Sequence, residues 1–151
     1  MRLMELLDKE HINYRVTEHR PTFTAQNFAA EEHEPGKFVA KPVIIKADDK
    51  YLMCVLPAPL KIDFDALKRQ LGTKSVALAD EKEIADIFPD CDLGAEPPFG
   101  NLYQLPTIID KSLTRDDHIK FQGGTHERAV TMSMEDYKRL VNPTVLDFCY
   151  K

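Results

Sequence analysis

The sequence has few cysteines, no long apolar run and no excess of basic residues. Its three cysteines, Cys54, Cys91 and Cys149, are widely spaced and form no CxxC pair, which argues against a disulfide framework and a zinc knuckle. No stretch approaches the roughly 20 apolar residues that a membrane span needs. The N-terminal residues MRLMELLDKEHI mix charges into their apolar positions, unlike a signal peptide. We therefore expect a cytoplasmic protein with no membrane partner.

The charge balance also limits the partners of this protein. The 151 residues include 20 Lys and Arg against 25 Asp and Glu, a formal net charge of −5. This excludes a uniformly basic domain that holds nucleic acid with its whole surface, and DNA is not an expected partner. Hydrophobic residues at 43% and charged residues at 30% are typical of a folded globular chain. We expect one domain over residues 1–151.

Several motifs that would identify an enzyme class are missing. The sequence has no HExxH, no GxGxxG and no Walker pattern, so nothing in it supports a zinc protease, a dinucleotide-binding protein or a P-loop protein. It has no internal repeat and no low-complexity tract. We expect no cofactor and no resident metal.

Local patterns predict a mixed α/β fold. Apolar spacing of three and four residues, with Thr, Asp or Ser as N-caps, predicts helices over residues 3–12, 25–32, 63–71, 80–88 and 133–140. Apolar and β-branched runs predict strands over residues 14–17, 38–47, 51–56, 75–79, 102–109, 118–121 and 128–132. The second and third of these strands are separated by Asp48, Asp49 and Lys50, which predicts a hairpin and therefore antiparallel pairing in the sheet.

The loop of residues 92–100, with sequence DLGAEPPFG, is the most informative segment. Its two glycines and the adjacent Pro97 and Pro98 give a stiff loop whose shape is set before any ligand arrives. Because proline has no N–H, a carbonyl oxygen or anion here would be held by the other amides, as in an oxyanion site. Those amides belong to Gly94, Ala95, Glu96, Phe99 and Gly100. The alternative is an ordered turn with no ligand, which the loop taken alone favours.

A second candidate is Lys41, within the apolar run FVAKPVII. A lysine is costly to bury, so its ammonium either emerges at a sheet edge or reaches an anion such as a phosphate. An edge lysine that discourages strand pairing is an equally good explanation. Lys46 is explained more simply as the solvated end of the same strand.

The third candidate is the segment 121–128, with sequence FQGGTHER. Gly123 and Gly124 could form a tight turn that brings Gln122 and His126 to a common cavity. A glycine bend within a strand series is the alternative, and it is favoured when the segment is taken alone.

A metal-dependent hydrolase is a weaker hypothesis. It would use His19, His33 and Cys91 as ligands. His33 and its neighbouring glutamates are better explained as a solvated helix end.

Taken in order, these segments resemble the YbaK and prolyl-tRNA-synthetase-associated editing-domain family, whose members deacylate aminoacyl-tRNA in trans or in cis. The resemblance extends from about Tyr14 to Leu140. It rests on the spacing of His19 with Thr24-Ala25, Ala40-Lys41 opening a strand, Leu52 to Pro57, Ile62 to Leu67 with Leu71-Gly72, Gly94 to Gly100, Leu105 to Asp110, and Gly123-Gly124. The resemblance implies a single α/β domain with a mixed, partly barrel-like sheet, and hydrolysis of the ester that joins a wrong amino acid to tRNA.

The resemblance also implies roles for individual residues. Lys41 would position the substrate through the terminal adenosine or its phosphate, and the loop from Gly94 to Pro98 would contact the aminoacyl group with its backbone. The expected catalytic residues are Lys41, Gly94 and His126. The expected substrate-binding residues are His19, Thr24, Ala95, Glu96, Pro97, Pro98, Phe99, Gly100, Gln122, Gly123 and Gly124.

The expected partner is the 3′ end of a mischarged aminoacyl-tRNA, and an aminoacyl-tRNA synthetase is a second candidate partner. Pro42 stands where relatives commonly carry Ser, Thr or Asn, which removes a polar group and an N–H beside Lys41. The alternative is therefore a non-catalytic module of the same fold that binds an aminoacyl-adenosine-like ligand, the tRNA end or a synthetase. Basic residues at the site would be Lys37, Lys41 and Lys46, while the surface elsewhere is kept acidic by Glu31, Glu32 and Glu34.

Overall fold

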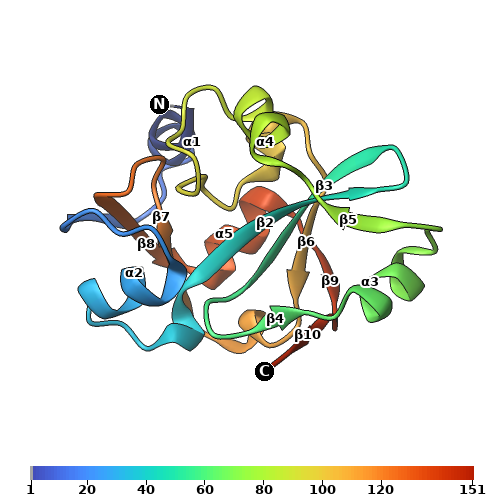
Figure 1. Ribbon diagram of the computed structural model, residues 1–151. Helices are drawn as coiled ribbons and strands as arrows, with labels where there is room; N and C mark the ends of the chain where they lie inside the picture. Colours follow the sequence, from blue (N-terminus) through green and yellow to red (C-terminus); the bar gives the residue numbers. More distant parts are fainter. Residues whose placement is uncertain (1) are drawn as a thin grey trace.

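The computed structural model describes residues 2–151, which form five α-helices around β-sheets (Figure 1). The helices are α1 (Arg2–Lys9), α2 (Ala25–Glu31), α3 (Phe64–Leu71), α4 (Glu81–Ile87) and α5 (Met134–Val141). The strands are β1 (Tyr14–Glu18), β2 (Ala40–Ala47), β3 (Lys50–Pro57), β4 (Lys61–Ile62), β5 (Val76–Leu78), β6 (Thr107–Asp110), β7 (His118–Gln122), β8 (Arg128–Ser133), β9 (Thr144–Leu146) and β10 (Cys149–Tyr150). Short 3₁₀ turns cover Gly36–Phe38 (η1), Gly100–Tyr103 (η2) and Leu113–Arg115 (η3).

Four predicted helices begin at the caps that the sequence indicates. The side chains of Thr24, Asp63 and Ser133 each accept a hydrogen bond of 3.1 Å from the backbone N–H three residues later. Asp80 forms a reciprocal capping box with Glu83, with bonds of 2.8 and 3.0 Å. Each cap satisfies an N–H that the helix leaves free, which stabilises the helix by about 1 kcal/mol.

The strands form three sheets. A five-stranded sheet has the order β5-β2-β3-β6-β9, in which β2 pairs antiparallel with β3 and β5, while β3-β6 and β6-β9 are parallel. A three-stranded antiparallel sheet has the order β1-β8-β7, and β4 pairs with β10. The larger sheet has free edges at β5 and β9 among the described residues, so it is open and the expected partly barrel-like closure is wrong.

One part of the strand prediction is also wrong. The predicted strand over 102–109 begins only at Thr107, because Gly100–Tyr103 is a 3₁₀ turn and Gln104 adopts a left-handed φ of 60°. Tyr103 packs on Phe88 with ring centroids 4.3 Å apart and donates a 2.9 Å hydrogen bond to Asp90. These tertiary contacts override the local strand pattern.

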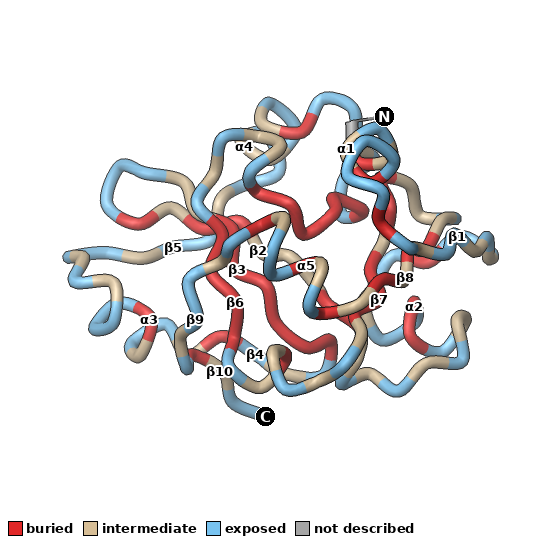
Figure 2. The backbone as a smooth tube through the Cα atoms, turned by 180° about the vertical axis from the view of Figure 1, so that it is seen from behind, coloured by how far each residue is buried: buried red, intermediate tan, exposed pale blue. Residues whose placement is uncertain are grey.

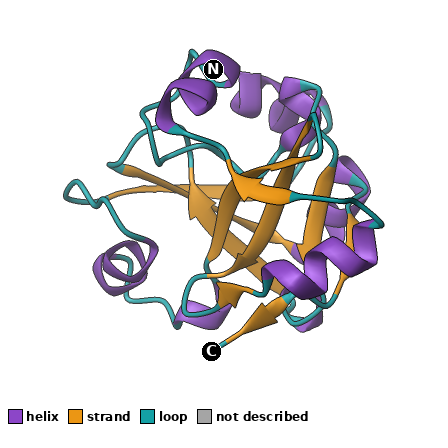
Figure 3. Ribbon diagram, turned by 45° about the vertical axis from the view of Figure 1, so that its right-hand side comes forward, coloured by secondary structure: helices purple, strands orange, loops and turns teal. Residues whose placement is uncertain are grey.

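The core lies between the two larger sheets and is closed by helices. Figure 2 shows the buried segments concentrated on β3, β6, β7 and β8, and Figure 3 shows the helices on the outside of the strands. Phe99 packs on Phe121 and Tyr137 with centroid distances of 5.5 and 5.3 Å. This aromatic cluster joins the loop before η2 to β7 and α5. Within the described residues, no helix has the length and apolar character needed to cross a membrane.

Candidate functional site

A cavity of about 130 Å³ lies where α2, the start of β2 and the loop 92–96 meet. Five of the predicted site residues line it: Thr24, Lys41, Gly94, Glu96 and Gln122. The other lining residues are mostly apolar, namely Phe23, Ala25, Phe28, Val39, Ala40 and Pro42. A cavity of about 150 Å³ holds one benzene molecule, so this cavity has the size for a small side chain and not for a nucleoside.

The loop 92–96 is tied to the glycine turn at 123–124. The N–H of Gly124 donates to the carbonyl of Ala95 at 2.9 Å, and the N–H of Asp92 donates to the carbonyl of Gly124 at 2.8 Å. Gly94 and Gly124 both have positive φ, 89° and 97°, which other residues adopt only with strain. The two predicted segments therefore form one wall, although Gly123 and Gly124 support it from behind and do not line the cavity.

The second half of the loop, residues 95–100, is buried in the core and holds the loop in position. Residues 95–100 are all buried, and the buried Tyr137 hydroxyl donates to the carbonyl of Pro98 at 2.5 Å. Ala95, Pro97, Pro98, Phe99 and Gly100 do not line the cavity; they fix the position of Gly94 and Glu96.

Only some of the loop amides are available to a ligand. The N–H of Ala95 donates to the carbonyl of Asp92 at 3.0 Å, and that of Phe99 donates to Pro97 at 2.8 Å. The amides of Gly94 and Glu96 donate to no backbone carbonyl among residues 2–151, and both residues line the cavity. The candidate oxyanion donors therefore reduce to these two amides. Both also interact with the Glu96 carboxyl group, so a ligand oxygen would have to replace that group to accept from them.

Glu96 places a carboxyl group in the wall of this small cavity. The residue is only 7% exposed, and its Oε2 atom is buried without a hydrogen-bond partner in the described chain. Burial raises the pKa of Glu96 above its ordinary value of 4.5, and the nearby amides of Glu96 and Gly94 partly oppose that shift. A buried carboxyl oxygen without a partner is costly to keep, so a ligand that supplies a hydrogen-bond donor or a cation would satisfy the Oε2 atom.

Among the described residues, the part of β2 that contains Lys41 pairs with β3 only. Strand β5 pairs only with residues Ile45 to Ala47 of β2. Lys41 lies opposite Leu56 of β3. The Lys41 ammonium donates to the carbonyl of Ala58 at 2.9 Å, which leaves two of its three donors for a ligand. Burial lowers the pKa of Lys41 below its ordinary value of 10.5. The other two basic candidates do not line the cavity: Lys37 lies over Phe38, and Lys46 lies over Tyr51 beside Glu83.

His126 lies behind the loop, next to Gly94. Its Nε2 atom is 2.8 Å from the carbonyl oxygen of Leu93, and because a carbonyl only accepts, Nε2 carries the hydrogen. The ring also packs on Phe23 at a centroid distance of 4.6 Å. Phe23 is 73% exposed at the rim of the cavity, and the sequence reasoning overlooked it because an isolated Phe carries no pattern. His126 is thus placed to hold the loop and the rim.

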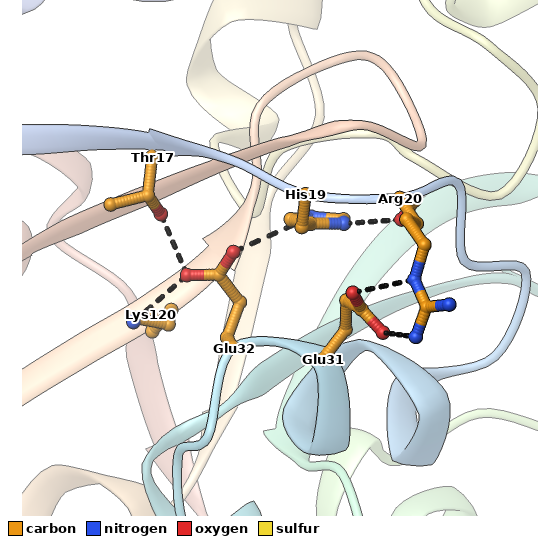
Figure 4. Close-up of polar contacts among 6 residues, drawn as sticks. All are labelled: Thr17, His19, Arg20, Glu31, Glu32 and Lys120. Carbon is orange, nitrogen blue, oxygen red and sulfur yellow. Dashed lines mark hydrogen bonds and ion pairs between the residues drawn. The ribbon is translucent and has the colours of Figure 1, made fainter.

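His19 lies behind the cavity in a buried polar cluster of Thr17, His19, Glu32 and Lys120 (Figure 4). The Glu32 carboxylate accepts from the Thr17 hydroxyl at 2.6 Å and from the Lys120 ammonium at 3.1 Å, and it lies 3.8 Å from His19 Nε2. The His19 ring packs edge-on against Phe28, a cavity residue, at 5.1 Å. The cluster fastens the C-terminal end of α2 to β1 and β7.

This cluster corrects the interpretation of the acidic segment after α2. The Glu32 side chain is 5% exposed and paired, not solvated. Glu31 binds Arg20 through two bonds of 3.0 Å, and Glu34 contacts His118 at 2.6 Å. The three proposed metal ligands His19, His33 and Cys91 do not converge, and no group of three or more His, Cys, Asp or Glu within the described part of the chain is arranged to hold a metal.

Comparisons with known proteins agree on one family. Residues 19–140 match the aminoacyl-tRNA editing domain. The chain is 26% identical over 152 residues to the multifunctional Ser/Thr-tRNA deacylase ProXp-y of Escherichia coli K12, covering 97% of this chain and 90% of that protein. It is 25% identical over 142 residues to the prolyl-tRNA editing protein ProX of Acetoanaerobium sticklandii, covering 89% and 85%.

Solved structures agree on the fold. A hypothetical protein superposes with a TM-score of 0.89 at 18% identity, covering 99% of this chain and all of the other (100%). A candidate trans-editing enzyme for prolyl-tRNA synthetase superposes with a TM-score of 0.85 at 19% identity, covering 99% and 96%. From the matched residues and the shared fold, the chain belongs to the aminoacyl-tRNA editing domain family.

Proposed function

We propose that this protein is a trans-acting deacylase that hydrolyses the ester between a small, wrong amino acid and the 3′ end of a tRNA. The observation that carries the proposal is the small cavity whose wall combines Lys41, the Glu96 carboxyl group and the two amides of Gly94 and Glu96. Relatives named as a Ser/Thr-tRNA deacylase and a prolyl-tRNA editing protein support the same reaction class.

In the proposed mechanism, the aminoacyl side chain enters the cavity and the ester carbonyl lies against the amides of Gly94 and Glu96. Water adds to the carbonyl carbon, and the two N–H groups stabilise the oxyanion that forms. The bond to the ribose oxygen then breaks, and that oxygen takes the proton that the water gives up. An ester is already activated, so positioning and oxyanion stabilisation can suffice without a nucleophilic side chain.

Two side chains would orient the substrate in this proposal. The free donors of Lys41 would bind the terminal phosphate or ribose, and Glu96 in its ionised form would accept from the α-ammonium group of the amino acid. His126 would act through Gly94 and Phe23, and is therefore a positioning residue. Because the cavity holds about 130 Å³, small amino acids are the expected substrates.

A deacylation assay tests the proposal. The purified chain is incubated with a panel of mischarged tRNAs, beginning with tRNA(Pro) charged with Ala, Ser, Thr or Cys, and released amino acid is measured against buffer. Loss of a charge-assisted hydrogen bond costs about 1.5–3 kcal/mol, so Lys41→Ala should lower kcat/KM by roughly 10- to 150-fold. Lys50→Ala, at the exposed first residue of β3, is the matched control and should retain activity.

A second candidate function has its own observation. Pro42 lines the cavity beside Lys41 and supplies neither a side-chain polar group nor an N–H. If no tRNA in the panel is hydrolysed above buffer while the chain still binds tRNA or prolyl-tRNA synthetase, the non-catalytic binding module replaces the deacylase.

A further inference from the structure

A second cavity lies beside the first and shares Lys41 with it. Its volume is about 280 Å³, and its lining residues come from β2, β3, β4, the start of α3, β5 and β10. Its lining is apolar at Val43, Leu56 and Ile62, and it also includes Lys61, Phe64 and Tyr150. Lys41 is the residue that the two linings share.

The wall of this groove is held in place by backbone pairing. Tyr150 of β10 lies directly opposite Lys61 of β4, so the two side chains are cross-strand neighbours. The N–H of Asp63 donates to the carbonyl of Phe148 at 2.7 Å, and the N–H of Phe148 donates to Asp110 at 3.0 Å. These bonds fix the C-terminal strand that carries Tyr150.

The groove presents aromatic and apolar side chains to solvent. Tyr150 is 52% exposed, Phe64 is 37% exposed and Leu78 is 61% exposed, and all three belong to its lining. Exposed apolar groups that gather in one groove commonly mark a binding surface. Aromatic rings next to cations are the surface that unpaired nucleotides bind, with bases stacked on rings and phosphates on lysines.

A third cavity lies at the rim of the first site, and it differs from this groove in its charge. That other cavity shares Phe23 with the first and contains Arg20, but Glu31 neutralises Arg20 through two hydrogen bonds. The groove contains Lys41 and Lys61 and no carboxylate, and neither lysine forms an ion pair within the described chain. On a protein with a net charge of −5, this groove is the route that suits a polyanion.

We propose that this groove binds the unpaired 3′-terminal nucleotides of tRNA, with a base stacked on Tyr150 and Phe64 and a phosphate on Lys61. The chain then passes Lys41, so that the terminal ester reaches the first cavity. This inference rests on the proposed function, because it supplies the path by which an aminoacyl-tRNA reaches that cavity.

Binding of an uncharged RNA tests the groove separately from hydrolysis. The probe is a fluorescent tRNA acceptor microhelix with its single-stranded 3′ end, compared with the same duplex lacking that end, and affinity is measured by anisotropy. Wild-type protein should prefer the probe with the 3′ end. Tyr150→Ala should weaken that binding roughly 5- to 150-fold, the range expected for loss of one base-aromatic stack, while Tyr150→Phe should retain it.

The salt dependence of RNA binding tests the role of the Lys61 ammonium group. Each phosphate contact on a single strand contributes a slope of about −0.7 in log K against log salt, so Lys61→Ala should make the slope shallower by about 0.7. Lys68→Ala, an exposed lysine of α3 outside the groove, is the matched control and should leave both affinity and slope unchanged. Thermal unfolding of each variant verifies that the fold is intact.

Three results would overturn the proposal. One is equal affinity for probes with and without the 3′ end. Another is unchanged binding in both Tyr150→Ala and Lys61→Glu. The third is a loss of binding in Phe23→Ala while Tyr150→Ala binds normally, which would place the RNA at the rim that contains Phe23 and Arg20. A chain that hydrolyses no ester but shows the expected binding pattern would refute the deacylase alone, whereas hydrolysis with unaltered KM in the groove variants would refute the groove alone.

Discussion

Replacing Lys120 by methionine should cost this protein a large part of its stability. The Lys120 and Glu32 side chains are 4% and 5% exposed, and their charged atoms are 3.1 Å apart. Removing the cation leaves the Glu32 carboxylate buried, with the Thr17 hydroxyl at 2.6 Å and His19 at 3.8 Å as its remaining partners. Breaking one side of a buried ion pair destabilises proteins by about 3–5 kcal/mol.

That loss is large compared with the total stability of a domain, which is about 5–15 kcal/mol. For a chain of this length each kcal/mol lowers Tm by roughly 2–4 °C, so the variant should unfold about 6–20 °C earlier. Urea unfolding followed by circular dichroism gives the free energy directly. Lys82→Met, on the exposed face of α4, is the control and should change stability by less than about 0.5 kcal/mol.

The double variant separates the unpaired charge from lost packing. Glu32→Gln removes the charge that Lys120→Met leaves unpaired, and the Thr17 hydroxyl can still donate to the amide oxygen. Glu32→Gln combined with Lys120→Met should therefore recover most of the loss. A cost below about 1 kcal/mol for Lys120→Met, or a double variant as unstable as the single one, would refute the reasoning.

Two further predictions concern the loop. Because burial raises the pKa of Glu96, deacylation that needs its ionised form should increase as pH rises through that raised value, and Glu96→Gln should lower kcat/KM and flatten this part of the pH profile. A raised carboxyl pKa costs stability once the group ionises, so the same variant should be no less stable than wild type at neutral pH, and a clear loss of stability there would contradict the assignment. Gly100→Ala would place a Cβ atom 2.3 Å from Thr107 Oγ1 and 2.8 Å from the Leu105 carbonyl oxygen, so it should destabilise the protein by at least about 1–3 kcal/mol in urea unfolding, and an unaffected midpoint would contradict that.

Local signals in the sequence were sufficient to predict the helices. Thr24, Asp63, Asp80 and Ser133 cap the helices that their positions predict, because a cap depends on a side chain and an amide only three residues apart. The short strands β4, β9 and β10 were missed because their pairing depends on distant partners. Lys61 pairs with Tyr150, for example, and neither segment has a strand pattern of its own.

In the candidate site, too, the sequence indicated the features that depend on neighbouring residues and missed those that depend on distant ones. The loop 92–96 and Lys41 were found because glycine, proline and a lysine in an apolar strand are unusual locally. The partner of Glu32 could not be found, since Lys120 lies 88 residues away and nothing local distinguishes a buried glutamate from a solvated one. Glu96 could be named from its loop, but its unpaired buried oxygen appears only in three dimensions.

The net charge of −5 is a poor guide to the local electrostatic potential near the two cavities. Three acidic residues at the end of α2 and just after it have partners: Glu31 pairs with Arg20, Glu32 pairs with Lys120, and Glu34 contacts His118. Glu96, in the wall of the first cavity, is the exception, because its Oε2 atom has no partner in the described chain. Lys41 and Lys61 form no ion pair in the described chain, so their charges are not cancelled at short range. With a Debye length of about 8 Å at physiological ionic strength, unpaired acidic residues farther away have little effect on a phosphate in the groove. An acidic protein can therefore bind the end of an RNA while repelling the rest of it, and two lysines imply modest affinity with a shallow salt dependence.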